Sequence, residues 1–230
     1  MLLADLRVVF AREGSAKRAQ AMQAYMKSAM PCHGVAMPRV RRLCKERFAA
    51  WTAASPAAWR RDVLALWTGA RFREERYAAL MLAGHRAARD WQTMDALAMY
   101  ERLIVEGAWW DLVDDIATHR LREILEREAV AMKRAMRAWS TDANLWKRRS
   151  AILCQVGAKQ DTDLKLLYDC IAPSLSSREF FLRKAIGWAL RSYAWTDPAE
   201  VARYVAAHAD ELSPLSKREA LKNAGKTRAR

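Results

Sequence analysis

The sequence predicts an all-α protein built from many short helices. Alanine, leucine, arginine, lysine and glutamate dominate the 230 residues, and all of these are strong helix formers. Runs of β-branched residues are absent, and glycine and proline stand singly between helical segments. Successive amphipathic segments joined by short turns, without a long seam, favour antiparallel helix pairs stacked into a solenoid. We therefore expect roughly a dozen helices of about 10–18 residues, in a single domain spanning residues 1–230.

Local signals mark where individual helices begin and end. A capping side chain followed by proline predicts a helix start, because the side chain accepts from a backbone N–H and proline suits the first turn. This pattern occurs at Ser55-Pro56, Asp197-Pro198 and Ser213-Pro214. Glycine near a helix end allows the chain to turn away, and Gly69, Gly107 and Gly157 are expected at such ends.

The charge balance points to a polyanionic partner. Lysine and arginine number 40 and aspartate and glutamate 26, for a formal charge of +14 and an isoelectric point near 10.1. Nucleic acid is the first candidate and an anionic membrane surface the second, while a generically basic protein is the alternative without a specific partner. No uncharged apolar stretch reaches about 18 residues, so we expect no membrane-spanning helix. No signal peptide is visible, because charged residues interrupt the N-terminal segment.

The cysteines and short motifs offer no familiar catalytic centre. Four scattered cysteines form no CxxC pair, and four histidines show no metal-ligand spacing, so we expect reduced, mostly buried thiols and no metal. Gly225-Lys226-Thr227 resembles the end of a phosphate-binding loop, but Ala220 replaces the earlier glycine and no strand precedes it. HExxH, GxSxG and glycine-rich dinucleotide motifs are also absent from the sequence. A cofactor is therefore not expected.

Asp114 is the acid that the sequence singles out. If 110–125 is a helix, Asp114 lies in the middle of its apolar face, one turn beyond Trp110. Asp111 and Asp115 point away and are expected to be solvated. A carboxylate on an apolar face is costly unless it is paired, hydrogen-bonded or used in chemistry. Asp114 is thus either a buried partner of an arginine or a carboxylate that stabilises a cation or positions water.

Arg149 has a similar position on a second helix, expected over 145–156. It lies among the apolar residues of that helix, while Lys147 and Arg148 are expected to face solvent. One interpretation is that Arg149 neutralises Asp114. The other is a guanidinium held at a cleft to bind a phosphate. Both can hold, one in the free protein and one in a complex.

Trp188 lies off the aliphatic face of a helix expected over 180–193. It is about 140° from the centre of that face and is flanked by Lys184 and Arg191, about one turn to either side. An indole between two cations is typical of a surface that contacts nucleotides. The alternative is packing on the second side of a solenoid layer. The other tryptophans, Trp109 among them, are expected to serve packing.

Segments spread along the chain resemble the AlkD-type DNA alkylation-repair glycosylases. The resemblance runs from about Tyr25 to Lys222 and rests on segments that occur in the family's order. They are Tyr25-Met26-Lys27, Gly34-Val35 with Pro38, Trp109-Trp110-Asp111 with Asp114, Arg149 to Leu153, Lys184 to Trp188, and Pro214 to Glu219. Each is weak alone, and together in register they make the resemblance specific. The chain departs from the pattern at Ala36, where members of the family can carry a polar residue such as glutamine.

The resemblance implies a fold and a site. The fold would be a right-handed solenoid of antiparallel HEAT-like helical pairs with a basic concave face. Asp114 would be the catalytic acid, and Trp110 and Trp188 the two aromatic residues of the active site. Arg149 would contact a phosphate and Tyr25 would line the same cleft. The basic neighbours Lys184, Arg191 and Arg148 are expected to add DNA contacts.

The function implied is that of a monofunctional bacterial DNA glycosylase in base excision repair. Its substrates would be cationic purines alkylated at N3 or N7, such as 3-methyladenine and 7-methylguanine, in double-stranded DNA. Such a protein is expected to act as a monomer, in the cytoplasm and at the nucleoid. Two alternatives remain: a non-catalytic relative that binds DNA structures, and a helical-repeat scaffold for other proteins, against which the positive charge argues.

Overall fold

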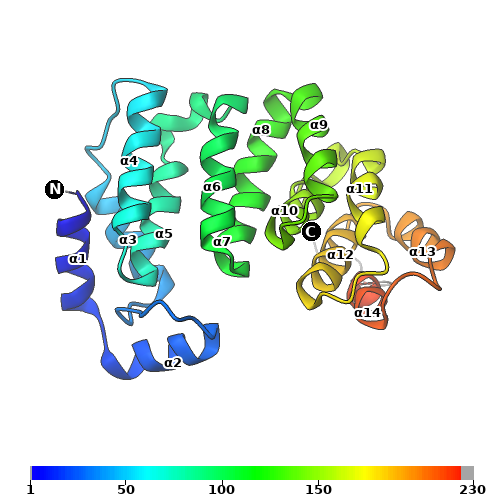
Figure 1. Ribbon diagram of the computed structural model, residues 1–230, viewed down its shortest axis with the longest axis horizontal. Helices are drawn as coiled ribbons and strands as arrows, with labels where there is room; N and C mark the ends of the chain where they lie inside the picture. Colours follow the sequence, from blue (N-terminus) through cyan, green and yellow to red (C-terminus); the bar gives the residue numbers. More distant parts are fainter. Residues whose placement is uncertain (1, 224–230) are drawn as a thin grey trace. The chain divides into compact units, whose positions relative to one another are not determined.

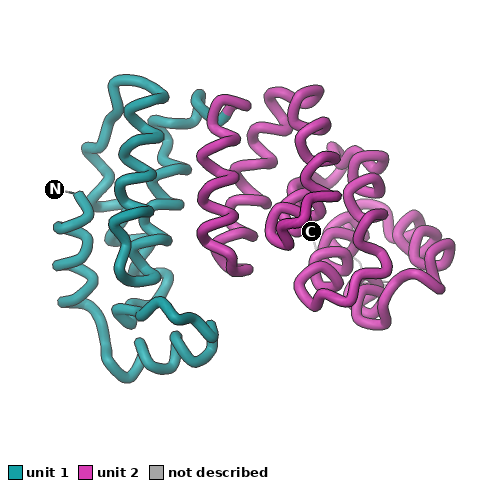
Figure 2. Tube along the Cα trace, viewed as in Figure 1, with its two compact units in different colours: residues 1–92 teal, residues 93–230 magenta. Residues whose placement is uncertain are grey.

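Helices account for all the regular secondary structure of residues 2–223, the part of the chain that the computed structural model describes (Figure 1). The all-α prediction is therefore confirmed. The chain divides into two compact units, residues 1–92 and residues 93–230 (Figure 2). The Gly225-Lys226-Thr227 segment lies outside the described residues.

The first unit contains α1 to α5 and a 3₁₀-helix. Helix α5 is central to it, because α4, α3 and α1 all pack against it. The cap at Ser55 forms as predicted, with its side chain accepting from the Ala58 N–H. The helices are α1 (Leu2–Glu13), α2 (Ala16–Met26), α3 (Met37–Arg47), α4 (Pro56–Gly69) and α5 (Arg73–Ala83), followed by the 3₁₀-helix Arg86–Trp91.

The second unit contains α6 to α14. Its succession of packed helices runs from α9 to α10, from α10 to α12 and from α12 to α14. The predicted caps at Asp197 and Ser213 both form. The helices are α6 (Leu97–Gly107), α7 (Trp110–Asp115), α8 (Arg122–Arg127), α9 (Ala129–Ser140), α10 (Leu145–Leu153), α11 (Leu164–Ile171), α12 (Phe180–Tyr193), α13 (Pro198–Ala207) and α14 (Pro214–Ala220).

Several helices are shorter than predicted, and one is irregular. The segment expected as a single α-helix over 110–125 is α7, then a π-helical segment (Ile116–Leu121), then α8. The Thr118 hydroxyl donates to the Asp114 carbonyl at 2.8 Å, and the His119 ring lies 2.9 Å from the Asp115 carbonyl. Side chains that bond to these carbonyls compete with the regular backbone ladder and accompany a widened turn. The apolar face nevertheless forms, since Val113, Ala117, Leu121, Ile124 and Leu125 are buried.

The cores are apolar and hold the cysteines. Tryptophans and large aliphatic residues fill them, among them Trp59 and Trp67 in the first unit and Leu103 and Ile116 in the second. All four cysteines are buried and form no disulfide, as predicted. No helix within residues 2–223 has the length and apolar character needed to cross a membrane.

Candidate active site

Asp114 and Arg149 form one ion pair. The Arg149 Nε donates to Asp114 Oδ1 at 2.7 Å, and its Nη2 donates to Oδ2 at 2.8 Å. This two-pronged geometry is the strongest arrangement for an arginine and a carboxylate. The exposed fraction of the side chain is 14% for Asp114 and 6% for Arg149. The sequence placed each charge on an apolar face, and the structure brings both together between α7 and α10.

The low solvent exposure of this ion pair changes the pKa of Asp114. Burial raises the pKa of Asp114 above its ordinary value, and the hydrogen bonds from Arg149 oppose that rise without cancelling it. The charges of Asp111 and Asp115 add to the rise. Asp115 itself is 46% exposed and lies beside His119. Asp114 is held in a bidentate pair with Arg149.

An aromatic cluster of Trp109, Trp146 and Phe181 reaches the guanidinium through the Phe181 ring. Trp109, at the N-cap of α7, has its ring centroid 5.5 Å from that of Phe181 and 6.1 Å from that of Trp146. The Arg149 guanidinium carbon lies 5.8 Å from the Phe181 ring centroid, and Arg149 Nη1 donates to the Phe181 carbonyl. Trp109 therefore packs as predicted, and Trp110 is half-buried at the first position of α7. Sequence reasoning missed Phe181, whose aromatic type alone carries no signal for this role.

The neighbours of Arg149 differ from the prediction. Lys147 was expected to face solvent, and this is wrong: its Nζ lies 2.7 Å from Glu101 Oε1 and 2.5 Å from Asp142 Oδ2, and its side chain is 13% exposed. Acids on α6 and on the turn before α10 draw it inward, and a helical-wheel pattern cannot show partners on other elements. Arg148 is half-buried. Helix α10 also ends at Leu153 rather than at residue 156.

Trp188 lies on α12 between Lys184 and Arg191 in the sequence. It is half-buried. Its two flanking cations share a partner that the sequence did not suggest: Lys184 Nζ lies 2.9 Å from Glu219 Oε1, and Arg191 Nη1 donates to Glu219 Oε2. Lys184 and Arg191 therefore neutralise an acid of α14 in the free protein. Their predicted contacts with DNA stay a prediction.

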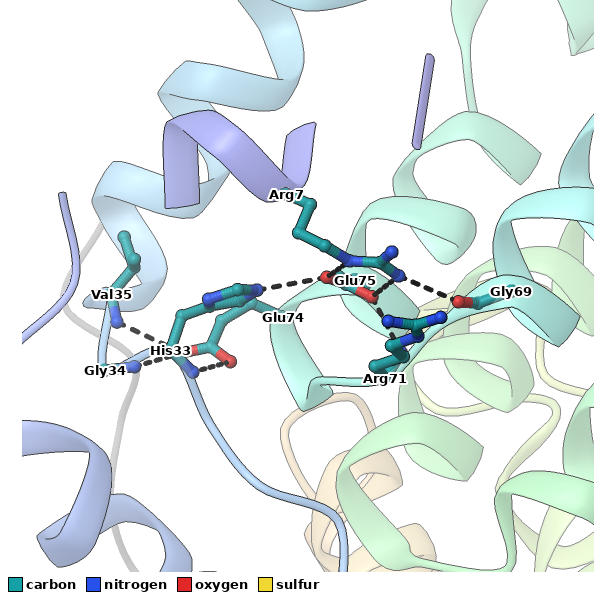
Figure 3. A network of polar contacts seen from close by, with 8 residues as sticks. All are labelled: Arg7, His33, Gly34, Val35, Gly69, Arg71, Glu74 and Glu75. Carbon is teal, nitrogen blue, oxygen red and sulfur yellow. Dashed lines mark hydrogen bonds and ion pairs between the residues drawn. The ribbon is translucent and has the colours of Figure 1, made fainter. Parts of the chain in front are cut away.

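Tyr25 belongs to the first unit, where it is 76% exposed on α2. The loop that follows α2 is tied to the first turn of α5. Glu74 accepts backbone N–H groups from His33, Gly34 and Val35 at 2.8–3.1 Å (Figure 3). Gly34 has φ +82°, and a Cβ there would lie 2.2 Å from the Ser15 carbonyl oxygen, so only glycine fits.

A second carboxylate completes this network. Glu75 accepts from Arg7 Nε at 2.8 Å and from the Arg71 N–H at 2.7 Å, and lies 3.1 Å from His33 Nε2 (Figure 3). Glu74 and Glu75 are both completely buried. Sequence reasoning missed them, because two acids at the start of a helix usually face solvent. They tie residues 33–35 of the loop after α2 to the start of α5.

Within residues 2–223, no cluster of histidine, cysteine, aspartate and glutamate could hold a metal ion. The second unit offers a carboxylate that is only 14% exposed, a guanidinium that fixes its orientation, and an aromatic ring, that of Phe181, beside the guanidinium. Such a site can stabilise positive charge next to an aromatic face and orient a water molecule.

The comparisons with known proteins agree on one family. A family model described as DNA alkylation repair enzyme matches residues 6–224, which span both units. A solved structure from Enterococcus faecalis, described as a predicted DNA alkylation repair enzyme, is similar to the chain with a TM-score of 0.80 and 26% sequence identity, over 94% of this chain and 98% of that one. No curated protein matches the chain. The chain belongs to the DNA alkylation repair enzyme family.

Proposed function

We propose that the protein is a monofunctional DNA glycosylase that hydrolyses the N-glycosidic bond of purines alkylated at N3 or N7 in duplex DNA. The observation that carries this proposal is the Asp114 carboxylate, which is only 14% exposed and is oriented by Arg149, whose guanidinium lies beside the Phe181 ring of an aromatic cluster. Membership of the DNA alkylation repair enzyme family and the charge of +14 support duplex DNA as the partner. We further propose that the protein acts as a monomer in the cytoplasm, at the nucleoid.

The release of an alkylated purine requires few catalytic side chains. A purine alkylated at N3 or N7 is cationic and becomes neutral when it leaves the sugar, so its departure needs no general acid. The sugar then develops oxocarbenium character, which a nearby anion stabilises. Asp114 supplies that anion, and the exposed edge of its side chain leaves room for a substrate or a water molecule. Trp110 and Trp188 supply aromatic faces that tolerate a cationic base.

The pairing of two lysines supports hydrolysis without lyase action. A Schiff-base mechanism needs an amine that is free to attack the sugar. Lys147, the lysine closest in sequence to Arg149, is held by Glu101 and Asp142, which favour its charged form. Lys184 is bonded to Glu219. Water activated beside Asp114 is therefore the proposed nucleophile.

The test is a duplex that carries a single 7-methylguanine. Incubation with the protein should release the free base and leave an abasic site that breaks only after alkali. The matched control is Asp115→Asn, which removes an exposed acid one residue from Asp114 and should leave base release intact. A wild-type protein that binds the duplex but releases no base would instead identify a non-catalytic DNA-binding relative. Spontaneous strand breakage at the abasic site would refute the monofunctional mechanism.

A further inference from the structure

Glu219 forms ion pairs with both cations that flank Trp188, Lys184 and Arg191. Its two carboxylate oxygens bond separately to Lys184 and Arg191, about one turn to either side of Trp188 on α12. Glu219 is 13% exposed, whereas Lys184 is 39% exposed and Arg191 25% exposed. The acid is therefore largely enclosed, while both cations keep an open side.

The backbone of α14 holds Glu219 in this position. A Cβ on Gly187 would lie 2.5 Å from the Glu219 Cβ and 3.0 Å from the Ser216 carbonyl oxygen, so α12 and α14 approach at a point where only glycine fits. The Ser216 hydroxyl donates to the Arg183 carbonyl at 3.0 Å. Because the helices approach so closely, we expect the Glu219 carboxylate to stay in place while the more exposed Lys184 and Arg191 side chains turn toward solvent. Figure 1 shows α12 and α14 side by side.

We propose that Glu219 competes with DNA phosphates for Lys184 and Arg191 and so weakens binding to undamaged duplex. The inference rests on the proposed function. A carboxylate and a phosphate offer cations the same kind of oxygen acceptor, so one can replace the other without a change of fold. Replacement of the carboxylate by a phosphate requires cations that a DNA backbone can reach, as the exposed sides of Lys184 and Arg191 allow. It does not suit Arg149, which is 6% exposed and bonded to both Asp114 and Phe181.

The electrostatics of Glu219 agree with this role. The hydrogen bond from Lys184 lowers the pKa of Glu219, and the charges of Arg191 and Lys222 lower it further. The carboxylate is therefore ionised at neutral pH and neutralises cations that would otherwise add to a strongly basic protein. A glycosylase with a charge of +14 would bind duplex DNA of any sequence through the phosphate backbone of the DNA. We expect Glu219 to limit that binding by neutralising the two cations that flank Trp188.

The experiment compares Glu219→Gln with Glu211→Gln. Both variants remove one negative charge, but Glu211 is 56% exposed and pairs with His208 rather than with a cation that flanks Trp188. Affinity for an undamaged duplex is measured by fluorescence anisotropy over a series of salt concentrations. Glu219→Gln should bind about 3- to 10-fold tighter than wild type, since it removes two partly exposed ion pairs. Its salt dependence should steepen by about one unit of slope, because binding no longer leaves a carboxylate to take up a cation.

Two further variants separate the possible results. In a Lys184→Gln/Arg191→Gln background, the gain from Glu219→Gln should disappear. Glu219→Asp keeps the charge but shortens its reach, and should bind with intermediate affinity. The proposal is overturned if Glu219→Gln binds undamaged duplex no more tightly than Glu211→Gln does. If Glu219→Gln fails to fold, the proposal is overturned by a Glu219→Asp variant that binds the duplex more weakly than wild type. A wild-type protein that binds no duplex at all refutes the proposed function instead.

Discussion

Asp114→Asn tests the centre of the proposed mechanism. Asparagine preserves the shape of the side chain but removes its charge, and its amide group places a donor against the Arg149 Nη2 donor. The guanidinium is then left 6% exposed without an anionic partner. Breaking a buried pair in this way costs about 3–5 kcal/mol. Arg149 keeps its hydrogen bond to the Phe181 carbonyl, so we expect a loss of stability at the lower end of this range, about 3 kcal/mol.

That loss is large enough to measure by thermal melting. In a protein of this size, 1 kcal/mol shifts the melting temperature by about 2–4 °C, so Asp114→Asn should melt about 6–12 °C lower. The Asp114→Asn/Arg149→Gln double variant removes both charges, and should recover to within about 1 kcal/mol of wild type. Asp114 would then have two roles, as the partner of Arg149 and as the anion of the reaction.

Single-turnover excision separates those roles. Arg149→Gln keeps Asp114 but removes its partner, so it is the reference for the double variant. If Asp114 stabilises the transition state, the double variant should excise 7-methylguanine at least about 10²-fold more slowly than Arg149→Gln, per folded molecule. Equal rates for these two variants would refute the catalytic role and leave Asp114 as a structural partner only.

Three further predictions concern side chains outside this pair. Tyr25→Ala should leave the melting temperature within about 2 °C of wild type because the side chain is 76% exposed, yet weaken duplex binding several-fold; unchanged binding would remove Tyr25 from the interface. Hydrogen bonds led by that from Arg203 lower the pKa of Glu200 to about 2, so its contribution to stability is present above about pH 4.3 and is lost as the pH falls toward 2. Melting curves from pH 5 to pH 2.5 should therefore fall less steeply for Glu200→Gln than for wild type. Glu74→Gln should cost about 2–3 kcal/mol and speed amide exchange at Gly34, whereas uniform exchange across the first unit would show global destabilisation instead.

The features of the fold that depend only on residues close together in the sequence were predictable. The caps at Ser55, Asp197 and Ser213 need only a short acceptor side chain and the next few backbone N–H groups, and all three form. The apolar faces were also predictable, because burial follows the helical period. Asp114 and Arg149 stood out for the same reason, as charges on faces that otherwise pack.

Partners far apart in the sequence were not predictable. Asp114 and Arg149 are 35 residues apart, and only tertiary packing decides that they meet. The same holds for the pair of Lys147 with Glu101 of α6 and for the pairs of Glu219 with Lys184 and Arg191 of α12. The π-helical segment after Asp115 depends on competing side-chain bonds that a periodic pattern does not contain.

Trp188→Ala decides whether the Trp188 side chain contacts DNA. Removing a fully buried tryptophan costs about 3–5 kcal/mol. Trp188 is only half-buried, so the expected loss of stability is nearer 2 kcal/mol. A base stacked on the indole contributes about 1–3 kcal/mol, so excision per folded molecule should fall by about 5- to 150-fold. Trp188→Phe is the matched control, because it keeps an aromatic face beside Lys184 and Arg191 and should retain most of the excision rate. A large melting shift in Trp188→Ala with unchanged excision per folded molecule would assign this tryptophan to packing.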